Sequence, residues 1–105
     1  MPKPIDRCLA LLKCLADETR FKILLMLKDG ERCVCEIFRE LGKEQSLISH
    51  HLRVARRCGL VKGVRRGKWV IYKLADPSIA ELLAKIDEIS TKLTKDATDR
   101  IPKRG

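Results

Sequence analysis

Two cysteines separated by one residue, Cys33 and Cys35, are the side chains of this chain best suited to chemistry. Val34, Ile37 and Phe38 recur around them at helical spacing, so a helix begins here. Residues two apart diverge on a regular helix but share a side of an extended chain, so a soft ion needing both sulfurs favours an unwound first turn. Thiols near a helix N-terminus also ionise more readily, which supplies the thiolates that metals and metalloids bind. The pair predicts a ligand-operated switch; the alternative is two inert cysteines packed in a core helix.

The composition favours a single small domain over residues 1–105 with an acidic partner. Charged residues make up 35% of the chain and the formal net charge is +9, which favours nucleic acid first and an anionic membrane second. No apolar run approaches the length of a membrane span and no signal peptide is recognisable, so we expect a cytoplasmic protein without a membrane partner. The five cysteines are then expected to be reduced thiols, not a disulfide framework.

The positive charge is concentrated in the middle of the chain. Residues 43–73 contain nine basic residues and one acid, Glu44, for a net charge of +8. An ordinary solvated surface mixes both signs, so this segment predicts a nucleic-acid surface. The nine are Lys43, Arg53, Arg56, Arg57, Lys62, Arg65, Arg66, Lys68 and Lys73.

A helix-turn-helix is predicted within this basic region. After a core helix capped by Asp17, a short helix follows Cys33 and stops at Gly42, and a second begins at Gln45 or Ser46 and runs to residue 59. Ile48, Leu52 and Ala55 of the second helix are expected to pack inward. A short helix, a tight turn and a basic second helix are typical of a motif whose second helix enters the DNA major groove.

A basic hairpin follows directly. Segments 60–65 and 69–74 are rich in β-branched and aromatic residues, and Gly67 between them suits a turn. A hairpin placed directly after a helix-turn-helix is the layout of a winged helix. Arg65, Arg66 and Lys68 would lie along the phosphate backbone or reach into the minor groove.

The first and last helices are predicted to form a dimer interface. Residues 5–15 carry an apolar stripe too wide for one neighbour, and Asp76 with Pro77 begins a last helix with a stripe of period near 3.6 over residues 79–93. We expect a mainly α fold with a small β-hairpin that forms a homodimer through helices 5–15 and 77–94. Packing of the last stripe within one chain is the open alternative. Residues 95–105 are expected to be a disordered tail.

Five segments carry a resemblance to a known family: LADETR at 15–20, CVCE at 33–36, ISHHL at 48–52, GLV at 59–61 and GKWVIY at 67–72. In this order and spacing they resemble the ArsR/SmtB family, over residues 5–93. The resemblance implies a dimeric winged-helix repressor that leaves its operator when it binds a metal or metalloid.

The resemblance also implies roles for individual residues. Cys33 and Cys35 match the family's metalloid motif, and His51 matches a histidine that is usually buried. Cys58 matches no ligand position and is expected to be a packing residue. The positions implied to contact DNA are Gln45, Ser46, Ser49, His50, Arg53, Arg65, Arg66 and Lys68.

Departures from the family pattern leave the ligand open. The arsenical-responsive branch commonly has a third cysteine three residues after the pair, where this chain has Phe38. A third thiolate would come from Cys8 or Cys14, in the same chain or the partner chain. The cadmium- and lead-responsive branch uses N-terminal cysteines together with the pair, so it also stays open. The zinc-responsive branch uses His and acidic residues of the last helix, which here has no His.

The sequence therefore predicts a repressor of a metal or metalloid resistance operon. It binds double-stranded operator DNA without a cofactor and is released when As(III) or Sb(III) binds Cys33 and Cys35 as thiolates. The alternatives are a Cd(II)/Pb(II) sensor, a thiol redox or persulfide sensor, and an architectural DNA binder without a ligand. An enzyme is not expected, because the chain has no phosphate-cradling loop and no base close to a cysteine in sequence.

Overall fold

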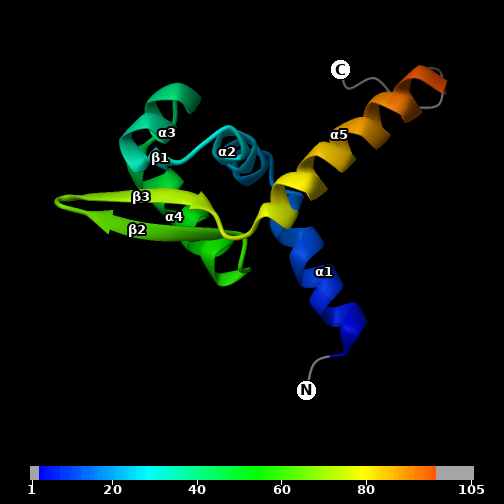
Figure 1. The fold of residues 1–105 in the computed structure, drawn as a ribbon, viewed down its shortest axis with the longest axis horizontal. Coiled ribbons are helices and arrows are strands. Elements are labelled where there is room, and N and C mark those ends of the chain that lie inside the picture. The colour runs from blue at the N-terminus through cyan, green and yellow to red at the C-terminus, as the bar shows by residue number, and fades with distance from the viewer. Residues whose placement is uncertain (1–2, 97–105) are drawn as a thin grey trace.

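A computed structural model describes residues 3–96 of the chain as five helices and three strands (Figure 1). The predicted winged helix-turn-helix, mainly helical with a small sheet, is confirmed. The elements in chain order are α1 (Pro4–Leu15), α2 (Glu18–Lys28), β1 (Arg32–Cys33), α3 (Val34–Leu41), α4 (Gln45–Arg57), β2 (Val61–Arg66), β3 (Trp69–Leu74) and α5 (Pro77–Asp96).

The core lies where α2, α3 and α4 meet the start of α5. Its six largest fully buried side chains come from all four helices, and each is at most 1% exposed. Burying such a side chain stabilises the fold by about 1.5–3 kcal/mol. The inward face predicted for α4 is confirmed. The six are Ile23, Leu24, Ile37, Ile48, Leu52 and Leu83.

Helix boundaries follow the capping residues that the sequence contains. The Asp17 carboxylate accepts a hydrogen bond from the backbone N–H of Arg20 at 2.9 Å, which holds the first turn of α2. That bond also holds the pKa of the Asp17 carboxyl below its ordinary value. Gly42 ends α3 with φ of 62°, a left-handed conformation that favours glycine. The short α3 and the longer α4 are thus joined by the tight turn that a helix-turn-helix requires.

The sheet has one strand more than the predicted hairpin. The strand order is β1-β3-β2, with β1 antiparallel to β3 and Cys33 opposite Ile71. The prediction of a hairpin alone was therefore incomplete, because a strand of two residues shows no period in the sequence. As a result, the strand that contains Cys33 pairs directly with the wing hairpin of β2 and β3.

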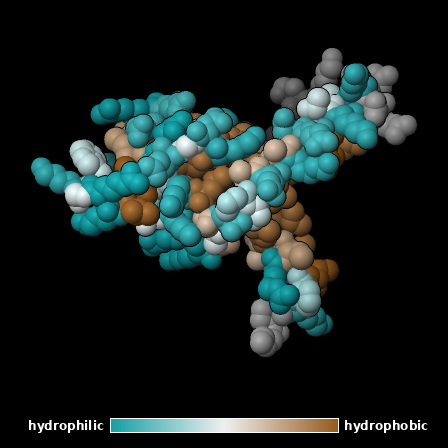
Figure 2. Space-filling view, in the orientation of Figure 1, coloured by the Kyte–Doolittle hydropathy of each residue, from teal (hydrophilic) through white to brown (hydrophobic). Residues whose placement is uncertain are grey.

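Helices α1 and α5 extend away from the winged core in different directions (Figure 1). Both carry large apolar side chains that this chain alone leaves exposed, and Figure 2 shows hydrophobic surface along α1. The exposed residues are Ile5, Leu9 and Leu12 on α1 and Ile89 and Leu93 on α5. The tail expected at 95–105 lies outside the described residues from 97 onward, while α5 includes 95 and 96. No helix within residues 3–96 is long and apolar enough to cross a membrane.

Candidate DNA interface and thiol site

The residues predicted to contact DNA lie on one helix and on the adjacent wing. Gln45, Ser46, Ser49, His50 and Arg53 belong to α4, and all are exposed except Ser49, which is half-buried. Arg65 and Arg66 end β2, and Lys68 lies in the turn before β3; these three side chains are exposed as well. The buried face of α4 fixes the helix on the core, so its polar face is presented to solvent beside the wing.

One of these arginines has an acidic partner that sequence reasoning missed. The Arg66 guanidinium donates hydrogen bonds to the Glu31 carboxylate at 2.6 Å and 3.4 Å. Both side chains are well exposed, at 60% and 40%. An exposed pair of this kind contributes about 0–1 kcal/mol, so it does not prevent Arg66 from reaching a phosphate. The pair joins the residue preceding β1 to the far end of β2.

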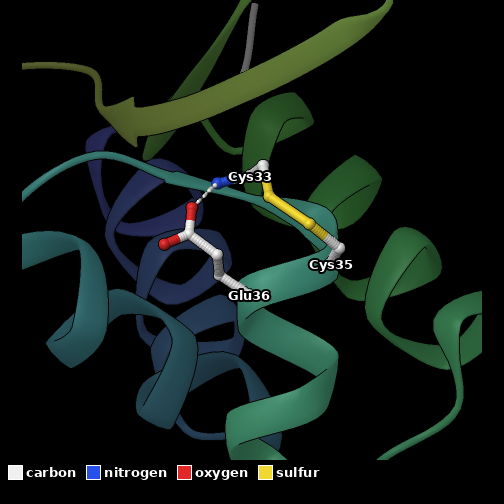
Figure 3. Close-up of a disulfide and its surroundings, with 3 residues drawn as sticks. All are labelled: Cys33, Cys35 and Glu36. Carbon is white, nitrogen blue, oxygen red and sulfur yellow. Dashed lines mark hydrogen bonds between the residues drawn. A yellow bond between two sulfur atoms is a disulfide. The ribbon is translucent and has the colours of Figure 1, made fainter.

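Cys33 and Cys35 lie at the start of α3, and their sulfur atoms are joined as a disulfide (Figure 3). Cys33 is the N-cap of α3 and has an extended backbone, with φ of −82° and ψ of 162°, while Cys35 is inside the first turn. The extended N-cap brings both side chains to the same side, as the sequence argument requires. The expectation that all five cysteines are reduced thiols was wrong for this pair, because the extended backbone at Cys33 brings its sulfur to that of Cys35.

Glu36 fixes the backbone at Cys33. Its carboxylate accepts a hydrogen bond from the Cys33 N–H at 2.9 Å, in a capping box at the start of α3 (Figure 3). Cys33 is 9% exposed and Cys35 is half-buried. The sulfur pair is thus held in place and partly shielded from water.

A cavity of about 340 Å³ opens beside the two sulfurs. Its walls come from α3, from the first residue of α4 and from the start of β3. Val34, Phe38, Trp69 and Val70 supply apolar surface, and Gln45 and Lys68 supply polar surface. The sulfur pair, the start of α4 and the wing therefore share one cavity.

The other three cysteines are free thiols at other places in the fold. Cys8 is exposed on α1, and Cys14 is buried at the end of α1. Burial, followed by the neighbouring Cys58 thiol, raises the pKa of Cys14 to about 11, so it is a poor thiolate donor. Cys58, expected to be a packing residue, is instead exposed at the C-cap of α4.

Cys33 and Cys35 can supply two of the ligands that a soft ion needs. Two neighbouring sulfurs are donors that thiophilic metals and metalloids prefer. Within residues 3–96, however, no three His, Cys, Asp or Glu side chains are grouped so that they could hold a metal ion. A third ligand from Cys8 or Cys14 therefore stays a prediction.

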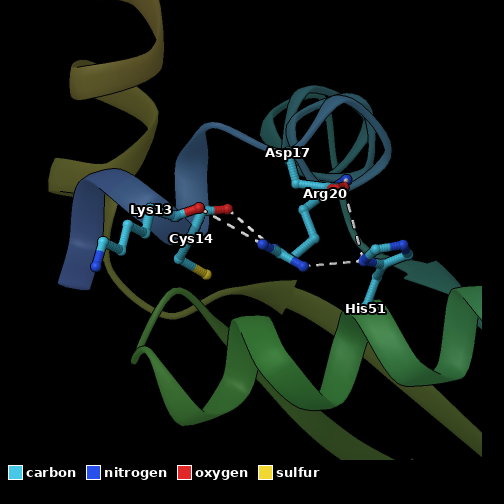
Figure 4. A network of polar contacts seen from close by, with 5 residues as sticks. All are labelled: Lys13, Cys14, Asp17, Arg20 and His51. Carbon is cyan, nitrogen blue, oxygen red and sulfur yellow. Dashed lines mark hydrogen bonds and ion pairs between the residues drawn. The ribbon is translucent and has the colours of Figure 1, made fainter. Parts of the chain in front are cut away.

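A polar network joins α4 to α1 and α2 (Figure 4). Arg20 donates to the Cys14 carbonyl at 3.0 Å and to Nδ1 of His51 at 3.1 Å, and the Asp17 carboxylate lies 3.7 Å from the same nitrogen. Because Nδ1 accepts from Arg20, the neutral ring carries its proton on Nε2. Burial, aided by Arg20 and opposed by Asp17, lowers the pKa of His51. The buried position expected for His51 is confirmed; Arg20 was missed.

A helix-turn-helix followed by a basic hairpin defines a winged-helix DNA-binding protein. Residues 17–62 match the family model described as a bacterial regulatory protein of the arsR family. An uncharacterized HTH-type transcriptional regulator of Methanocaldococcus jannaschii is 36% identical over 85 residues, covering 80% of this chain and 96% of that protein. The chain belongs to the ArsR family of transcriptional regulators and is not an enzyme.

Two further similarities bear on function and assembly. The arsenical resistance operon repressor of Escherichia coli is 47% identical over 77 residues, covering 72% of this chain and 65% of that protein. A homodimeric winged helix-turn-helix domain from Mycobacterium bovis, described as a possible ArsR-family regulator, superposes with a TM-score of 0.83 at 28% identity. That match covers 88% of this chain and 85% of the solved chain.

Proposed function

We propose that this chain is a homodimeric repressor of a metal or metalloid resistance operon, released from DNA when As(III) or Sb(III) binds Cys33 and Cys35. The observation that carries the proposal is the shared cavity: the sulfur pair lies beside Lys68 of the wing and Gln45 of α4, which we propose is the recognition helix that enters the DNA major groove. A ligand bound to the sulfurs would therefore be in reach of two residues that are proposed to contact DNA. The similarity to an arsenical resistance repressor supports the same ligand class.

Operator binding is assigned to α4 and the wing. In a dimer, two α4 helices about one DNA turn apart would enter successive major grooves, with Gln45, Ser46, Ser49 and His50 at the base edges. Arg53, Arg65, Arg66 and Lys68 would contact phosphates, which position the protein. The net charge of +8 over residues 43–73 makes this affinity strongly dependent on salt.

Release requires the ligand to change the elements that bind DNA. Cys33 is in β1, which pairs with β3 of the wing, and Cys35 is in α3, which packs on α4. An arsenic atom bonded to both sulfurs separates them relative to a disulfide, so the first turn of α3 and the β1–β3 pairing must adjust. A coupling of about 1–3 kcal/mol would weaken DNA binding about 5- to 150-fold.

Thiol oxidation is a second candidate signal, favoured by the disulfide between Cys33 and Cys35. The two proposals use the same cysteines and differ in the chemical state of this pair that releases the protein from DNA. In the metalloid reading, the reduced protein binds DNA and an arsenic compound releases it. In the redox reading, formation of the disulfide alone releases it.

Fluorescence anisotropy of labelled upstream DNA separates these readings. Reduced wild type and the Cys33→Ser and Cys35→Ser variants are titrated onto DNA and then exposed to arsenite, to Cd(II) or to a mild thiol oxidant. We expect arsenite to release the wild type and neither variant. Release by oxidant alone would favour the redox reading, and release by Cd(II) alone would favour the cadmium sensor. DNA binding unaffected by all three would contradict the switch at Cys33 and Cys35.

A further inference from the structure

The cysteine pair supplies fewer bonds than As(III) forms in its compounds. As(III) forms three bonds, and Cys33 and Cys35 supply two of them. The thiols of Cys8 and Cys14 lie on α1, and Cys14 is buried beside Cys58. Within residues 3–96 no third His, Cys, Asp or Glu joins the pair in a metal-binding group. The third substituent can therefore be part of the ligand itself.

The cavity beside the sulfurs suits an apolar substituent. Its volume of about 340 Å³ falls within the range of small-molecule sites, about 300–1,000 Å³. Val34 and Phe38 form the α3 side, and Trp69 and Val70 form the wing side. Trp69 is 60% exposed, so a group bound there would cover apolar surface that this chain leaves open to water. Lys68 is the one charged residue among the cavity walls, within the described part of the chain.

From this arrangement we infer that the site binds a trivalent organoarsenical whose aryl or alkyl group occupies the cavity between α3 and β3. The inference rests on the proposed function and specifies its ligand.

Binding of this ligand requires reduced cysteines. Two equivalents of a cellular thiol first reduce the Cys33–Cys35 disulfide and become a disulfide themselves. The hydrated arsenical, RAs(OH)₂, then condenses with the two thiols, forming two As–S bonds and releasing two waters. The As–C bond and the oxidation state of arsenic stay unchanged.

A ligand in this cavity would compete with DNA, because two residues of the cavity walls are also proposed to contact DNA. Gln45 begins the recognition helix and Lys68 lies in the wing turn, and both line the cavity. An organic group between them would hold the wing and the recognition helix at a fixed separation. The organic group thus adds a steric contribution to release that inorganic arsenite lacks.

The test compares phenylarsine oxide with arsenite on reduced full-length protein. Trp69→Ala removes one wall of the cavity at an exposed position, and Val64→Ala is the matched control, an exposed apolar residue on β2 outside the cavity. The readout is the ratio of the concentrations of the two compounds that give half-release of labelled DNA. We expect Trp69→Ala to reduce the preference for phenylarsine oxide about fivefold or more. Trp69→Phe should restore most of the preference, and Val64→Ala should leave it unchanged.

Trp69 is the single tryptophan of the chain, so its fluorescence provides a direct measurement of binding. Phenylarsine oxide should quench the emission of reduced wild type at one equivalent per chain, and Cys33→Ser should abolish this. The inference would be overturned if Trp69→Ala left the preference for phenylarsine oxide unchanged, or if Trp69 emission were not quenched when the compound is bound. Release of DNA by arsenite would in that case still support the proposed function. Should neither compound release DNA, the proposed function itself fails, and the inference with it.

Discussion

Cys33 belongs to two elements, since it pairs with Ile71 as the last residue of β1 and caps α3 as its N-cap. Cys33 therefore joins the strand paired with the wing directly to α3. Its backbone position depends on Glu36, whose carboxylate accepts the Cys33 N–H. A change at the sulfur of Cys33 would act directly on β3 of the wing and on α3, which packs on α4.

Replacing Glu36 by Ala tests this position. The lost hydrogen bond should lower the free energy of unfolding by about 1 kcal/mol. It should also raise the arsenite concentration needed for DNA release, because the first turn of α3 is less well held. Chemical denaturation and anisotropy measure the two effects. Glu36→Gln keeps a carbonyl oxygen for the capping box and should resemble wild type; equal loss in both variants would argue against the capping role.

The buried histidine predicts a stability change with pH. Because the folded-state pKa of His51 lies below its ordinary value of 6.5, the unfolded chain binds the extra proton more readily. The contribution of neutral His51 to the free energy of unfolding is fully present above pH 6.5. It is lost as the pH falls below 6.5 toward the pKa of His51 in the folded state. Denaturation of wild type at pH 7.5 and pH 5.5 should show this loss, and His51→Asn should show less of it. His50→Asn, at the exposed neighbour, should retain it; an identical pH response in His51→Asn would refute the assignment.

At the scale of elements, sequence pattern predicted those parts that depend on periodicity or on local capping. The inward face of α4 follows from Ile48 and Leu52, and the start of α2 follows from Asp17. The strand β1 was missed because two residues carry no period. Contacts between elements were missed as well, since Glu31 and Arg66 are 35 residues apart and Arg20 and His51 are 31 apart. Such pairs depend on the packing of elements, which a one-dimensional pattern does not specify.

The ion pair between Glu31 and the wing gives a prediction about DNA affinity. Glu31→Gln removes the negative charge opposite Arg66, so the guanidinium is held less strongly and is easier to transfer to a phosphate. We expect DNA affinity to rise by about two- to fivefold at low salt, as for an exposed pair of up to about 1 kcal/mol. The salt dependence of binding should steepen slightly. Glu18→Gln, which removes a surface pair with Lys22 on α2, is the control. Weaker binding by Glu31→Gln would mean that Glu31 orients Arg66 productively.

At the scale of the whole molecule, two helical arms expose apolar residues that one chain does not cover. Leu9 on α1 and Leu93 on α5 are 45% and 56% exposed, although each belongs to an apolar stripe. A second copy of the chain that covers both stripes would also set the distance between the two recognition helices. Dimerisation and operator binding are then linked through the same two helices.

Charge substitutions in these stripes test the dimer. Leu9→Glu and Leu93→Glu should shift the chain from dimer to monomer in sedimentation velocity, because a carboxylate would be buried without a partner. DNA affinity should fall at least about tenfold, since one half-site is lost. Leu25→Glu, at an exposed leucine of α2, is the matched control. Variants that remain dimeric would place the interface elsewhere.

The most direct test of the central claim measures the dissociation constant for DNA of reduced wild-type protein with and without saturating arsenite. Anisotropy gives both values, and intact mass confirms that arsenic is bound. We predict that bound arsenite weakens DNA binding about 5- to 150-fold, and that DNA weakens arsenite binding by the same factor. Cys33→Ser should show one dissociation constant under both conditions. Equal DNA affinity of the arsenic-bound and arsenic-free wild type would contradict control of DNA binding by Cys33 and Cys35.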